Sequence, residues 1–597
     1  MRRVLTSRLS RAASFLATGK LAAFFLRHPR RTVLLVVVVL YADTLANRPV
    51  LDDGWVIFDN SLIKSLRNVP AIFRQPYNAA TPGSNAGVYR PVTTLSYAIN
   101  YAIGGPLVVG YHAVNIVLHI LCCLLVFELG RRLARAARVT DPERGALIAA
   151  LLFAIHPIHV EAVTAMVGRA DLLAALGSLA CLYLTCTRAE ARWRYPAALI
   201  ALALGVLSKE NAAVTPLLFG LIAFALPGAA GFDTRPNLFT IDGRRPLWRL
   251  CAIAGGMVAA ASVYMLLHPG GAGIPPGSQW FGGQPRSTVF YTMTRVLAEY
   301  IRLLVFPHPL GIDFYYATKF PFTSTFTASA AADTALWLTV LAFGIVALRR
   351  APVAGLGVLW VFVALLPVLN IVPIGALMGE RLLYLPSVGF CVAVGTGVAL
   401  LPGVLARRPR VAWLAVPVAT AIAIAGLALA VKSWVRNAAW RDALTLYEVE
   451  VRKAPTDVVL NNNLAVEYTA RGQFDLARQR LEVALRVAPW YWRAQVNMGI
   501  VAHRLNDDSA AMRWLDQAHR IAPSESTPYF FMGVVSADAG KLAEAVDYLA
   551  RAEALDSLDA RTRFYRGGYL TRLGRAAEAE RELKRARELD PALPPSP

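Results

Sequence analysis

Long apolar runs separated by short polar segments dominate the first 432 residues of the chain. A transmembrane helix needs about 20 consecutive, mostly apolar residues, and about eleven runs approach this length. They lie at 31–47, 109–130, 145–164, 170–187, 195–208 with its flank, 211–227, 249–267, 333–348, 353–370, 383–401 and 411–432. The run 289–306 contains Arg295, Glu299 and Arg302 and is amphipathic, so we expect an interfacial helix there. The pattern predicts an all-α polytopic membrane bundle over residues 31–432.

A different pattern begins after Lys432, where alanine, arginine and glutamate become frequent. Shifting this segment by 34 residues aligns prolines, leucines and glycines with one another. The aligned columns include Pro455, Pro489, Pro523 and Pro591; Leu481, Leu515, Leu549 and Leu583; and Gly499, Gly533 and Gly567. This period is typical of tetratricopeptide repeats, each of which is a pair of helices. We therefore expect a tetratricopeptide-repeat α-solenoid in 433–597, with a capping helix at 440–452 and four repeats over about 455–590.

Composition supports the membrane assignment. The chain of 597 residues is 56% hydrophobic and 17% charged, whereas globular domains average about 45–50% apolar and about 25% charged residues. This balance argues against an ordinary soluble enzyme, and it excludes a disordered chain, which needs few apolar residues. The six cysteines all lie in apolar stretches, so they indicate neither a disulfide framework nor a zinc motif.

The net charge of +22 is concentrated in clusters of arginine. The N-terminal residues 1–30 are basic, and further clusters occupy gaps between the apolar runs. Cytoplasmic loops of membrane proteins carry this excess, so the clusters indicate topology. An alternating path through eleven spans then places two long loops, at about 48–108 and 268–332, and the repeats on the outer side. Contact with anionic lipids is the alternative use of this charge, and we expect no nucleic-acid partner.

Two adjacent carboxylates, Asp52 and Asp53, follow the first apolar run at the membrane boundary. A carboxylate beside a bilayer costs free energy unless it is solvated, forms an ion pair or takes part in binding or catalysis. One of them can act as a general base toward an acceptor hydroxyl while the other positions it. Ordinary turn formation by Asp before Gly is the structural alternative.

Basic residues also lie near the predicted outer ends of the spans, namely Arg90, Lys209 and Arg381. Guanidinium and ammonium groups bind phosphate through charge-assisted hydrogen bonds, so together these residues can bind a lipid phosphate. Each of them singly is also explained by extension of its charged end to the membrane interface.

Further polar residues occur where helices should be apolar. They are His112, His156, His159, Glu161, Arg169, Asp171, Glu210, Glu380 and Tyr384. Buried histidines most often satisfy hydrogen bonds in a core, but His156, His159 and Glu161 loosely resemble a metal cluster, although Pro157 interrupts the helix that a ligand pair would use. The sequence indicates no particular metal, and it does not decide whether a divalent ion such as Mg²⁺ or Mn²⁺ takes part in the reaction.

Several segments together resemble a known family. They are DDGWVIFDN, YRPVTTLSYAINY, GYHAVNIVLHI, HPIHVEAVTAMVGRADLLAAL, LSKEN and GERLLYLPS, followed by the repeats. In this order they are similar to the transmembrane and tetratricopeptide-repeat (TMTC-type) O-mannosyltransferases and to bacterial membrane proteins of similar layout. The resemblance covers Leu51 to Pro591. It implies a GT-C glycosyltransferase fold, a polyprenyl- or dolichyl-phosphate-linked sugar as donor, and chemistry on the outer or lumenal face.

Carried over to this sequence, the family's diacidic motif corresponds to Asp52 and Asp53, and PHPLGIDFYY, with Asp313 and Tyr315, resembles a second family segment. The stretch WFGGQP at 280–285 departs from the acidic, Asn-Pro-containing stretch of relatives and leaves the acceptor open. The Ala/Arg-rich composition is typical of a bacterial protein, in which undecaprenyl phosphate can replace dolichol and the sugar need not be mannose.

The resulting expectation is a membrane glycosyltransferase of the inner membrane, or of the endoplasmic reticulum in a eukaryote. It moves mannose or another hexose to a Ser/Thr hydroxyl of a protein that the repeats recruit. Asp52 or Asp53 removes the proton of the hydroxyl, and Arg90, Lys209 and Arg381 stabilise the departing lipid phosphate. The alternatives are a repeat scaffold without catalysis, a transporter of lipid-linked sugars, and a transferase acting on a lipid or glycan.

Overall fold

The computed structural model describes residues 25, 27–77, 88–186, 193–232, 241–267, 281, 283–371, 376–406, 413–590 and 593–594. Every regular element in these ranges is a helix, which confirms the all-α prediction for this part of the chain. The chain divides into two compact units, Met1–Asp442 and Ala443–Pro597. Nearly all of the basic N-terminus 1–30, residues 280 and 282 of WFGGQP, and Pro591 lie outside the described residues.

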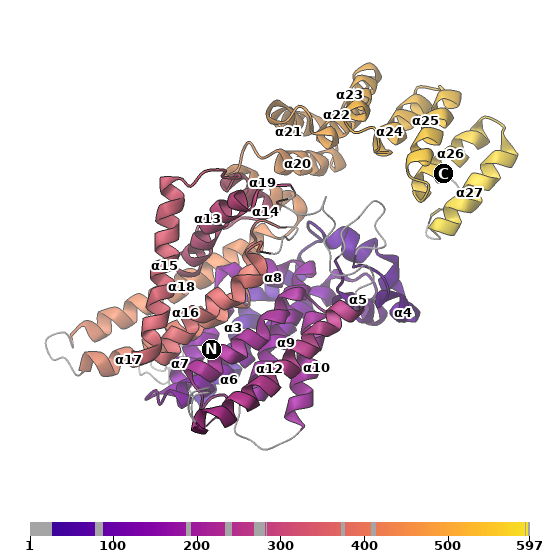
Figure 1. The fold of residues 1–597 in the computed structure, drawn as a ribbon. Helices are drawn as coiled ribbons and strands as arrows, with labels where there is room; N and C mark the ends of the chain where they lie inside the picture. The colour runs from indigo at the N-terminus through magenta and orange to yellow at the C-terminus, as the bar shows by residue number, and fades with distance from the viewer. Residues whose placement is uncertain are drawn as a thin grey trace, which may run out of the picture. The chain divides into compact units, whose positions relative to one another are not determined.

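Each apolar run of the first unit corresponds to a helix (Figure 1). In chain order these helices are α3 (Pro29–Tyr41), α6 (Val108–Ala136), α7 (Pro142–Ile155), α9 (Arg169–Thr185), α10 (Arg194–Val206), α11 (Thr215–Ala225), α12 (Ile241–Leu267), α15 (Ala328–Arg350), α16 (Pro352–Leu365), α17 (Pro386–Ala406) and α18 (Ala415–Ala439). The predicted boundary after residue 432 falls within α18, which continues to Ala439.

Their lengths differ from the expectation of about eleven spans. Among the described residues, five helices are long and apolar enough to cross a membrane, or six if the bent pair Pro142–Ile155 and Pro157–Thr164 is one span. Four further apolar helices are shorter than a single span. Polar or proline-containing breaks account for part of the difference: Lys209 and Glu210 separate α10 from α11, and Pro157 follows the end of α7. Short helices that meet at such breaks create polar backbone and side chains at depth, which membrane proteins tolerate where a cavity is lined.

Small residues bring the helices of this unit close together. α16 packs against α17, and α9 packs against α10. A Cβ atom added to Gly357 would collide with the carbonyl oxygen of Gly389, and the reverse substitution would also collide. Small residues at such crossings let helix backbones approach closely, which is how membrane helices associate without a strong hydrophobic drive.

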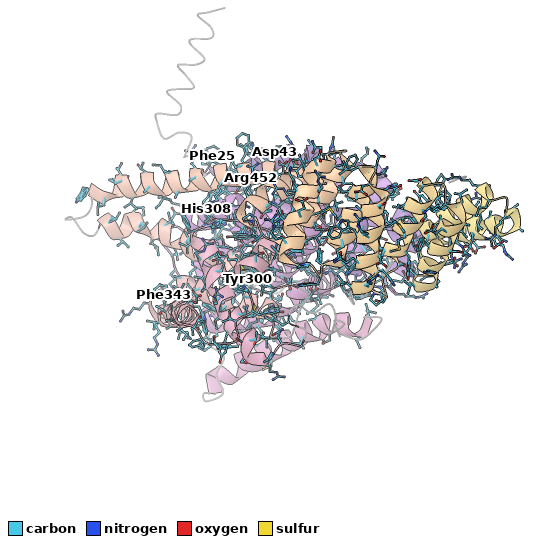
Figure 2. All side chains as sticks on the ribbon, turned by 90° about the horizontal axis from the view of Figure 1, so that it is seen from above. Phe25, Asp43, Tyr300, His308, Phe343 and Arg452 are labelled. Carbon is cyan, nitrogen blue, oxygen red and sulfur yellow. The ribbon has the colours of Figure 1, made fainter. Side chains whose placement is uncertain are left out.

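The outward faces of α15 and α18 are apolar and exposed. On α15, Phe343, which is labelled in Figure 2, is 59% exposed. Ile424 and Leu427 on α18 are likewise exposed. Such surfaces on long apolar helices are expected where lipid chains replace protein contacts.

Shorter elements of the first unit join these helices. The segment after α3 forms η1 (Ala42–Ala46), η2 (Gly54–Phe58), η3 (Ser61–Lys64), η4 (Leu66–Asn68), α4 (Val69–Ile72) and α5 (Pro91–Gly104). Between α7 and α9 lie η5 (Pro157–His159), α8 (Val160–Thr164) and η6 (Met166–Gly168), and η7 (Glu210–Val214) precedes α11. Later elements are α13 (Arg286–Val305), α14 (Asp313–Lys319), η9 (Leu366–Val368) and η10 (Glu380–Leu383). The interfacial role of 289–306 stays a prediction, and α13 buries one face that packs against α15.

The second unit consists of successive helix pairs (Figure 1). After α19 (Ala443–Lys453), the pairs are α20 (Val458–Ala470) with α21 (Phe474–Val487), α22 (Trp492–Arg504) with α23 (Asp508–Ile521), α24 (Thr527–Asp538) with α25 (Leu542–Leu555), and α26 (Ala560–Arg572) with α27 (Ala576–Leu589). Within a pair, a Cβ added to Gly499 would lie 2.8 Å from Cγ of Leu515, which explains the small residue in that column. The tetratricopeptide-like repeats are therefore confirmed.

Candidate active site

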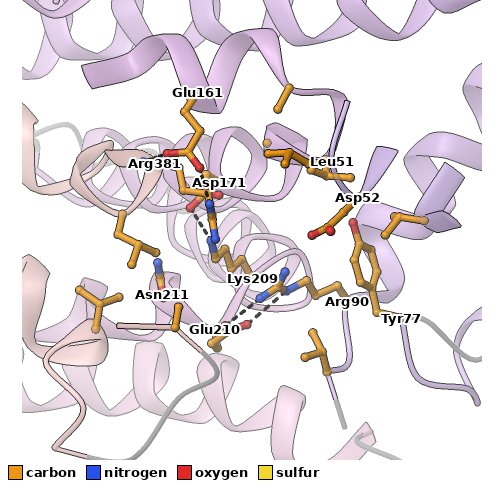
Figure 3. Close-up of a pocket in the computed structure, with 18 of the residues that line it drawn as sticks. Leu51, Asp52, Tyr77, Arg90, Glu161, Asp171, Lys209, Glu210, Asn211 and Arg381 are labelled. Carbon is orange, nitrogen blue, oxygen red and sulfur yellow. Dashed lines mark hydrogen bonds and ion pairs between the residues drawn. The ribbon is translucent and has the colours of Figure 1, made fainter. Parts of the chain in front are cut away.

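A cavity of about 300 Å³ opens within the first unit. Its lining includes Asp52 and all three cations that the sequence indicated as phosphate ligands, Arg90, Lys209 and Arg381. Figure 3 shows the Asp52 carboxylate and the Arg90 guanidinium directed into the same space. Residues separated by up to about 330 positions in the sequence are thus brought together by the helix packing.

A tight turn gives the two adjacent aspartates different surroundings. The backbone N–H of Asp53 donates to the carbonyl of Val50 at 3.0 Å, and the N–H of Val50 donates to Oδ2 of Asp53 at 3.0 Å. Leu51, between them, has a positive φ of 50°. The second carboxylate oxygen, Oδ1, accepts the N–H of Val167 at 2.9 Å. Asp53 is therefore fully buried and accepts hydrogen bonds from the backbone, whereas Asp52 lines the cavity.

Both carboxyl groups bind protons more tightly than an ordinary aspartate. Desolvation raises the pKa of Asp52, although its side chain is accessible from the cavity, and nearby Arg381 partly opposes this shift. Desolvation also raises the pKa of Asp53 to about 7, against the two backbone hydrogen bonds that favour its ionised form. The Trp55 indole N–H donates to Oδ1 of Asp52 at 3.3 Å and helps to orient this carboxylate. A carboxylate with a raised pKa is better matched to proton transfer near neutral pH.

Two of the three cations form ion pairs with carboxylates. The partner of Arg90 lies in the break between α10 and α11, and the partner of Lys209 lies on α9. Arg90 donates through Nε and Nη2 to the two oxygens of Glu210, at 3.4 and 2.9 Å. Lys209 Nζ donates to Oδ1 of Asp171 at 2.7 Å, and both side chains are only 6% exposed. An ammonium has three N–H donors, so this ion pair fixes Lys209 and leaves further donors for a ligand.

The third cation joins two segments far apart in the sequence. Arg381 donates to Oδ1 and Oδ2 of Asp313 at 3.0 and 2.6 Å, and it also forms a short ion pair with Glu161. The backbone N–H of Arg381 donates to Oε2 of Glu161 at 2.9 Å. A Cβ at Gly379 would lie 2.7 Å from Oδ1 of Asp313, so a larger residue there would displace this carboxylate from the pair.

The charges of the lining nearly balance. Three cations face the four carboxylates of Asp52, Glu161, Asp171 and Glu210. Fixed ion pairs of this kind preorganise N–H donors for an oxyanion without reorganisation at the moment of reaction. The cavity can therefore hold an anionic group next to a carboxylate that accepts a proton.

Other polar residues singled out in the sequence lie away from this cavity. Tyr384 lines a smaller pocket that shares Asp171 and Arg381 with it, and its hydroxyl contacts Nδ1 of His119 at 2.6 Å. Glu380 accepts the hydroxyl of Tyr316 at 3.0 Å. The remaining residues are buried among protein groups: His112, His156, His159 and Arg169.

His156, His159 and Arg169 have local protein partners. His156 Nε2 contacts the carbonyl of Leu304 at 3.0 Å, and His159 Nε2 contacts Oγ of Ser387 at 2.8 Å. Arg169 donates to Oδ1 of Asn115 at 3.0 Å. Within the described residues, no group of three or more His, Cys, Asp or Glu side chains is placed to hold a metal ion.

Four polar or aromatic residues of the lining were not predicted from the sequence: Trp55, Tyr77, Asn211 and Trp440. Burial raises the pKa of Tyr77 to about 12, so its hydroxyl keeps its proton. Trp440, at the end of α18, is 1% exposed, and its indole N–H has no acceptor among the described residues. Aromatic residues are common at membrane boundaries for other reasons, so their sequence positions carry no signal of a cavity.

Known mannosyltransferases are similar to this chain in sequence. Residues 90–232 match the family model for dolichyl-phosphate-mannose-protein mannosyltransferase. The chain is 26% identical to the protein O-mannosyl-transferase F38B6.6 of Caenorhabditis elegans over 473 residues, which covers 77% of this chain and 63% of the relative. It is 27% identical to the protein O-mannosyl-transferase Tmtc3 of Drosophila melanogaster, with 78% and 56% covered. The chain thus matches less than two thirds of the length of these relatives.

Among solved structures, the tetratricopeptide-repeat protein TTC0263 of Thermus thermophilus aligns with 29% of this chain and 88% of its own length, at 20% identity and a TM-score of 0.24. The sequence relatives and the family match confirm the resemblance to TMTC-type O-mannosyltransferases that the sequence motifs indicated. They also support a multi-pass membrane protein.

Proposed function

We propose that the protein is a membrane glycosyltransferase with a GT-C-type helical bundle of about eleven membrane helices. It transfers mannose or another hexose from a polyprenyl- or dolichyl-phosphate-linked donor to a serine or threonine hydroxyl. The observation that carries the proposal is the single cavity in which Asp52 lies with Arg90, Lys209 and Arg381. Cations for a phosphate and a base for a hydroxyl are the two chemical requirements of such a transfer.

Asp52 is the base in this proposal, and Asp53 is a positioning residue. Only Asp52 lines the cavity, whereas both carboxylate oxygens of Asp53 accept backbone N–H groups. As the acceptor oxygen bonds to the anomeric carbon, Asp52 takes the hydroxyl proton and the bond from that carbon to the phosphate oxygen breaks. The electron pair leaves with the lipid phosphate, and one displacement inverts the anomeric configuration.

The negative charge that develops on the lipid phosphate is stabilised by the three cations. Their carboxylate partners keep them in place before the donor binds, which lowers the reorganisation that catalysis requires. In this proposal the indole N–H of Trp440, a buried donor without a protein acceptor among the described residues, donates to an oxygen of the sugar. A hydroxyl-rich sugar is a ligand that such a donor suits.

In this proposal the acceptor polypeptide is recruited by the repeats of the second unit, because stacked helix pairs form extended surfaces that bind protein segments. The transfer takes place on the extracytoplasmic face in this proposal, because the positive-inside rule applied to the arginine clusters of the sequence supports an outer position of the long loops and the repeats. In a bacterium this is the outer face of the inner membrane.

The test uses the purified full-length protein in lipid nanodiscs. Transfer of radiolabelled sugar is measured from undecaprenyl-phosphate mannose, and separately from the glucose analogue, to a peptide rich in serine and threonine. We expect Asp52→Asn to lower the rate by about 100-fold or more, the usual contribution of general base catalysis. Asp59→Asn is the matched control, since Asp59 is an exposed aspartate of the same loop outside the cavity lining.

If the wild-type protein transfers neither sugar, or if Asp52→Asn transfers at the wild-type rate, the proposed reaction is wrong. Binding of the lipid-linked sugar without transfer would instead agree with a transporter. A protein that binds no donor would agree with a repeat scaffold.

A further inference from the structure

A second polar pocket lies where the apolar helices α3, α6 and α7 meet their basic flanking residues. Its volume is about 380 Å³. α3 packs against both α6 and α7. The lining residues are Arg27, His28, Pro29, Arg30, Arg31, Phe127, Arg131 and Glu143. None of these residues lines the cavity of the candidate active site.

One carboxylate organises two of these arginines. Glu128 Oε1 accepts Nε and Nη2 of Arg30 at 2.9 and 2.5 Å, and Oε2 accepts Nη2 of Arg131 at 2.6 Å. The Glu128 side chain is only 10% exposed, whereas that of Arg30 is 68% exposed. A guanidinium has five N–H donors in a fixed plane, so each arginine retains donors after this contact. The shared carboxylate therefore holds two guanidinium groups side by side.

Positive charge remains in excess after these pairs form. Arg27 and Arg31 also line the pocket, and neither forms an ion pair within the described residues. Glu143 is the one carboxylate of the lining, and Arg135 and Arg131 already contact it. Paired guanidinium groups bind phosphate oxygens in a bidentate manner, so the excess charge suits a phosphodiester.

An apolar surface continues directly from this pocket along α3. Leu34, Leu35, Val38 and Val39 follow the arginines within the next two turns and are 48%, 51%, 40% and 71% exposed. In a membrane helix, such a surface is covered by acyl chains. A ligand that extends from the basic pocket onto this surface therefore has an anionic head and an apolar tail.

We propose that this pocket is a binding site for the headgroup of an anionic phospholipid, whose acyl chains lie along the exposed face of α3. Basic pockets between membrane helices at a membrane boundary are suited to such headgroups. The site is separate from the donor cavity and does not depend on the proposed transferase activity.

The test measures lipid binding to the full-length protein in detergent micelles by native mass spectrometry. The probes are phosphatidylglycerol, neutral phosphatidylcholine and soluble glycerol 1-phosphate. We expect the double variant Arg27→Gln/Arg31→Gln to weaken phosphatidylglycerol binding about tenfold, since each arginine near a lipid surface contributes to the attraction. The matched control is Arg349→Gln/Arg350→Gln, a basic pair at the end of α15 that does not line the pocket.

Glu128→Gln separates an organised site from general attraction of charge. Removal of this carboxylate makes the protein more basic, yet it releases Arg30 and Arg131 from their fixed positions. We expect phosphatidylglycerol to bind the Glu128→Gln variant more weakly than the wild type. The melting temperature of the Arg27→Gln/Arg31→Gln variant should equal that of the wild type, because both arginine side chains are exposed.

Three results would overturn the proposal. The first is a change below about threefold in Arg27→Gln/Arg31→Gln, and the second is an equal loss in the α15 control. The third is binding of glycerol 1-phosphate as tightly as phosphatidylglycerol, which would mean that the pocket takes a free phosphate and that the α3 surface contributes nothing.

Discussion

The backbone N–H of Val167 donates to Oδ1 of Asp53 at 2.9 Å. This hydrogen bond ties the turn that carries Asp52 to the segment between α8 and α9, 114 positions later in the chain. The other oxygen of Asp53 accepts the N–H of Val50 within the turn itself. One buried carboxylate thus sets both the shape of the turn and its place against the helices, so the position of Asp52 depends on its neighbour.

Replacement of Asp53 is expected to affect stability as well as activity. Asp53→Ala leaves two buried N–H groups without acceptors, which costs about 1–3 kcal/mol for each such group. Asp52→Asn removes a charge that faces the cavity and should leave the thermal midpoint nearly unchanged. Thermal unfolding of both variants in detergent checks this difference. Equal midpoints for Asp53→Ala and the wild type would contradict the positioning role.

The raised pKa of Asp52 predicts the pH dependence of transfer. A base must be ionised to accept a proton, so kcat/KM should fall as the pH drops through the pKa of Asp52 in the folded protein. Desolvation raises this pKa, so the midpoint of the acid limb should lie above about 4, the usual value for aspartate. Rate measurements from pH 4 to pH 9 locate the limb. A residual rate of Asp52→Asn that keeps the same limb would assign it to another group.

The sequence predicted much of this site because chemistry constrains where charges occur in an apolar chain. Asp52, Arg90, Lys209 and Arg381 stand next to apolar runs, and a charge at such a boundary needs a use or a partner. The repeats were also predictable, since Gly499 and Leu515 recur with the period that their packing requires. In both cases a local pattern carries the information.

The ion pairs and the choice of the base depend on contacts that no local pattern records. Glu210 meets Arg90 across 120 positions, and Glu161 meets Arg381 across 220. Asp52 and Asp53 are chemically identical neighbours, and the N–H groups of Val50 and Val167, which both donate to Asp53, distinguish them. Trp440 and Tyr77 line the cavity, but the segments that carry them have the composition that is common at membrane boundaries. Tertiary packing alone decides these features.

The ion pair of Glu161 with Arg381 allows structural and catalytic roles to be separated. Arg381→Gln leaves Glu161, which is 2% exposed, without its cation, and a broken buried pair costs about 3–5 kcal/mol. The double variant Glu161→Gln/Arg381→Gln removes the buried unpaired charge and leaves without its cation only Asp313, whose side chain is 33% exposed, so it should recover most of the stability. Because the phosphate still lacks its cation, transfer should stay low in both variants. Recovery of the transfer rate together with stability would show that Arg381 acts only as a structural partner.

Trp440→Phe tests the contact of the indole N–H with the sugar. The substitution keeps an aromatic ring in a fully buried position and removes a donor that has no acceptor among the described residues. The smaller ring leaves a cavity and should lower the thermal midpoint, whereas loss of a ligand hydrogen bond of about 1 kcal/mol should lower kcat/KM about fivefold. The matched control is Trp434→Phe on the same helix, since Trp434 is 58% exposed and lies outside the lining. Kinetics with the lipid-linked sugar and thermal unfolding are measured for both variants. If Trp440→Phe transfers sugar as the control does, the indole N–H does not contact the donor, and only the aromatic ring of Trp440 contributes to the cavity.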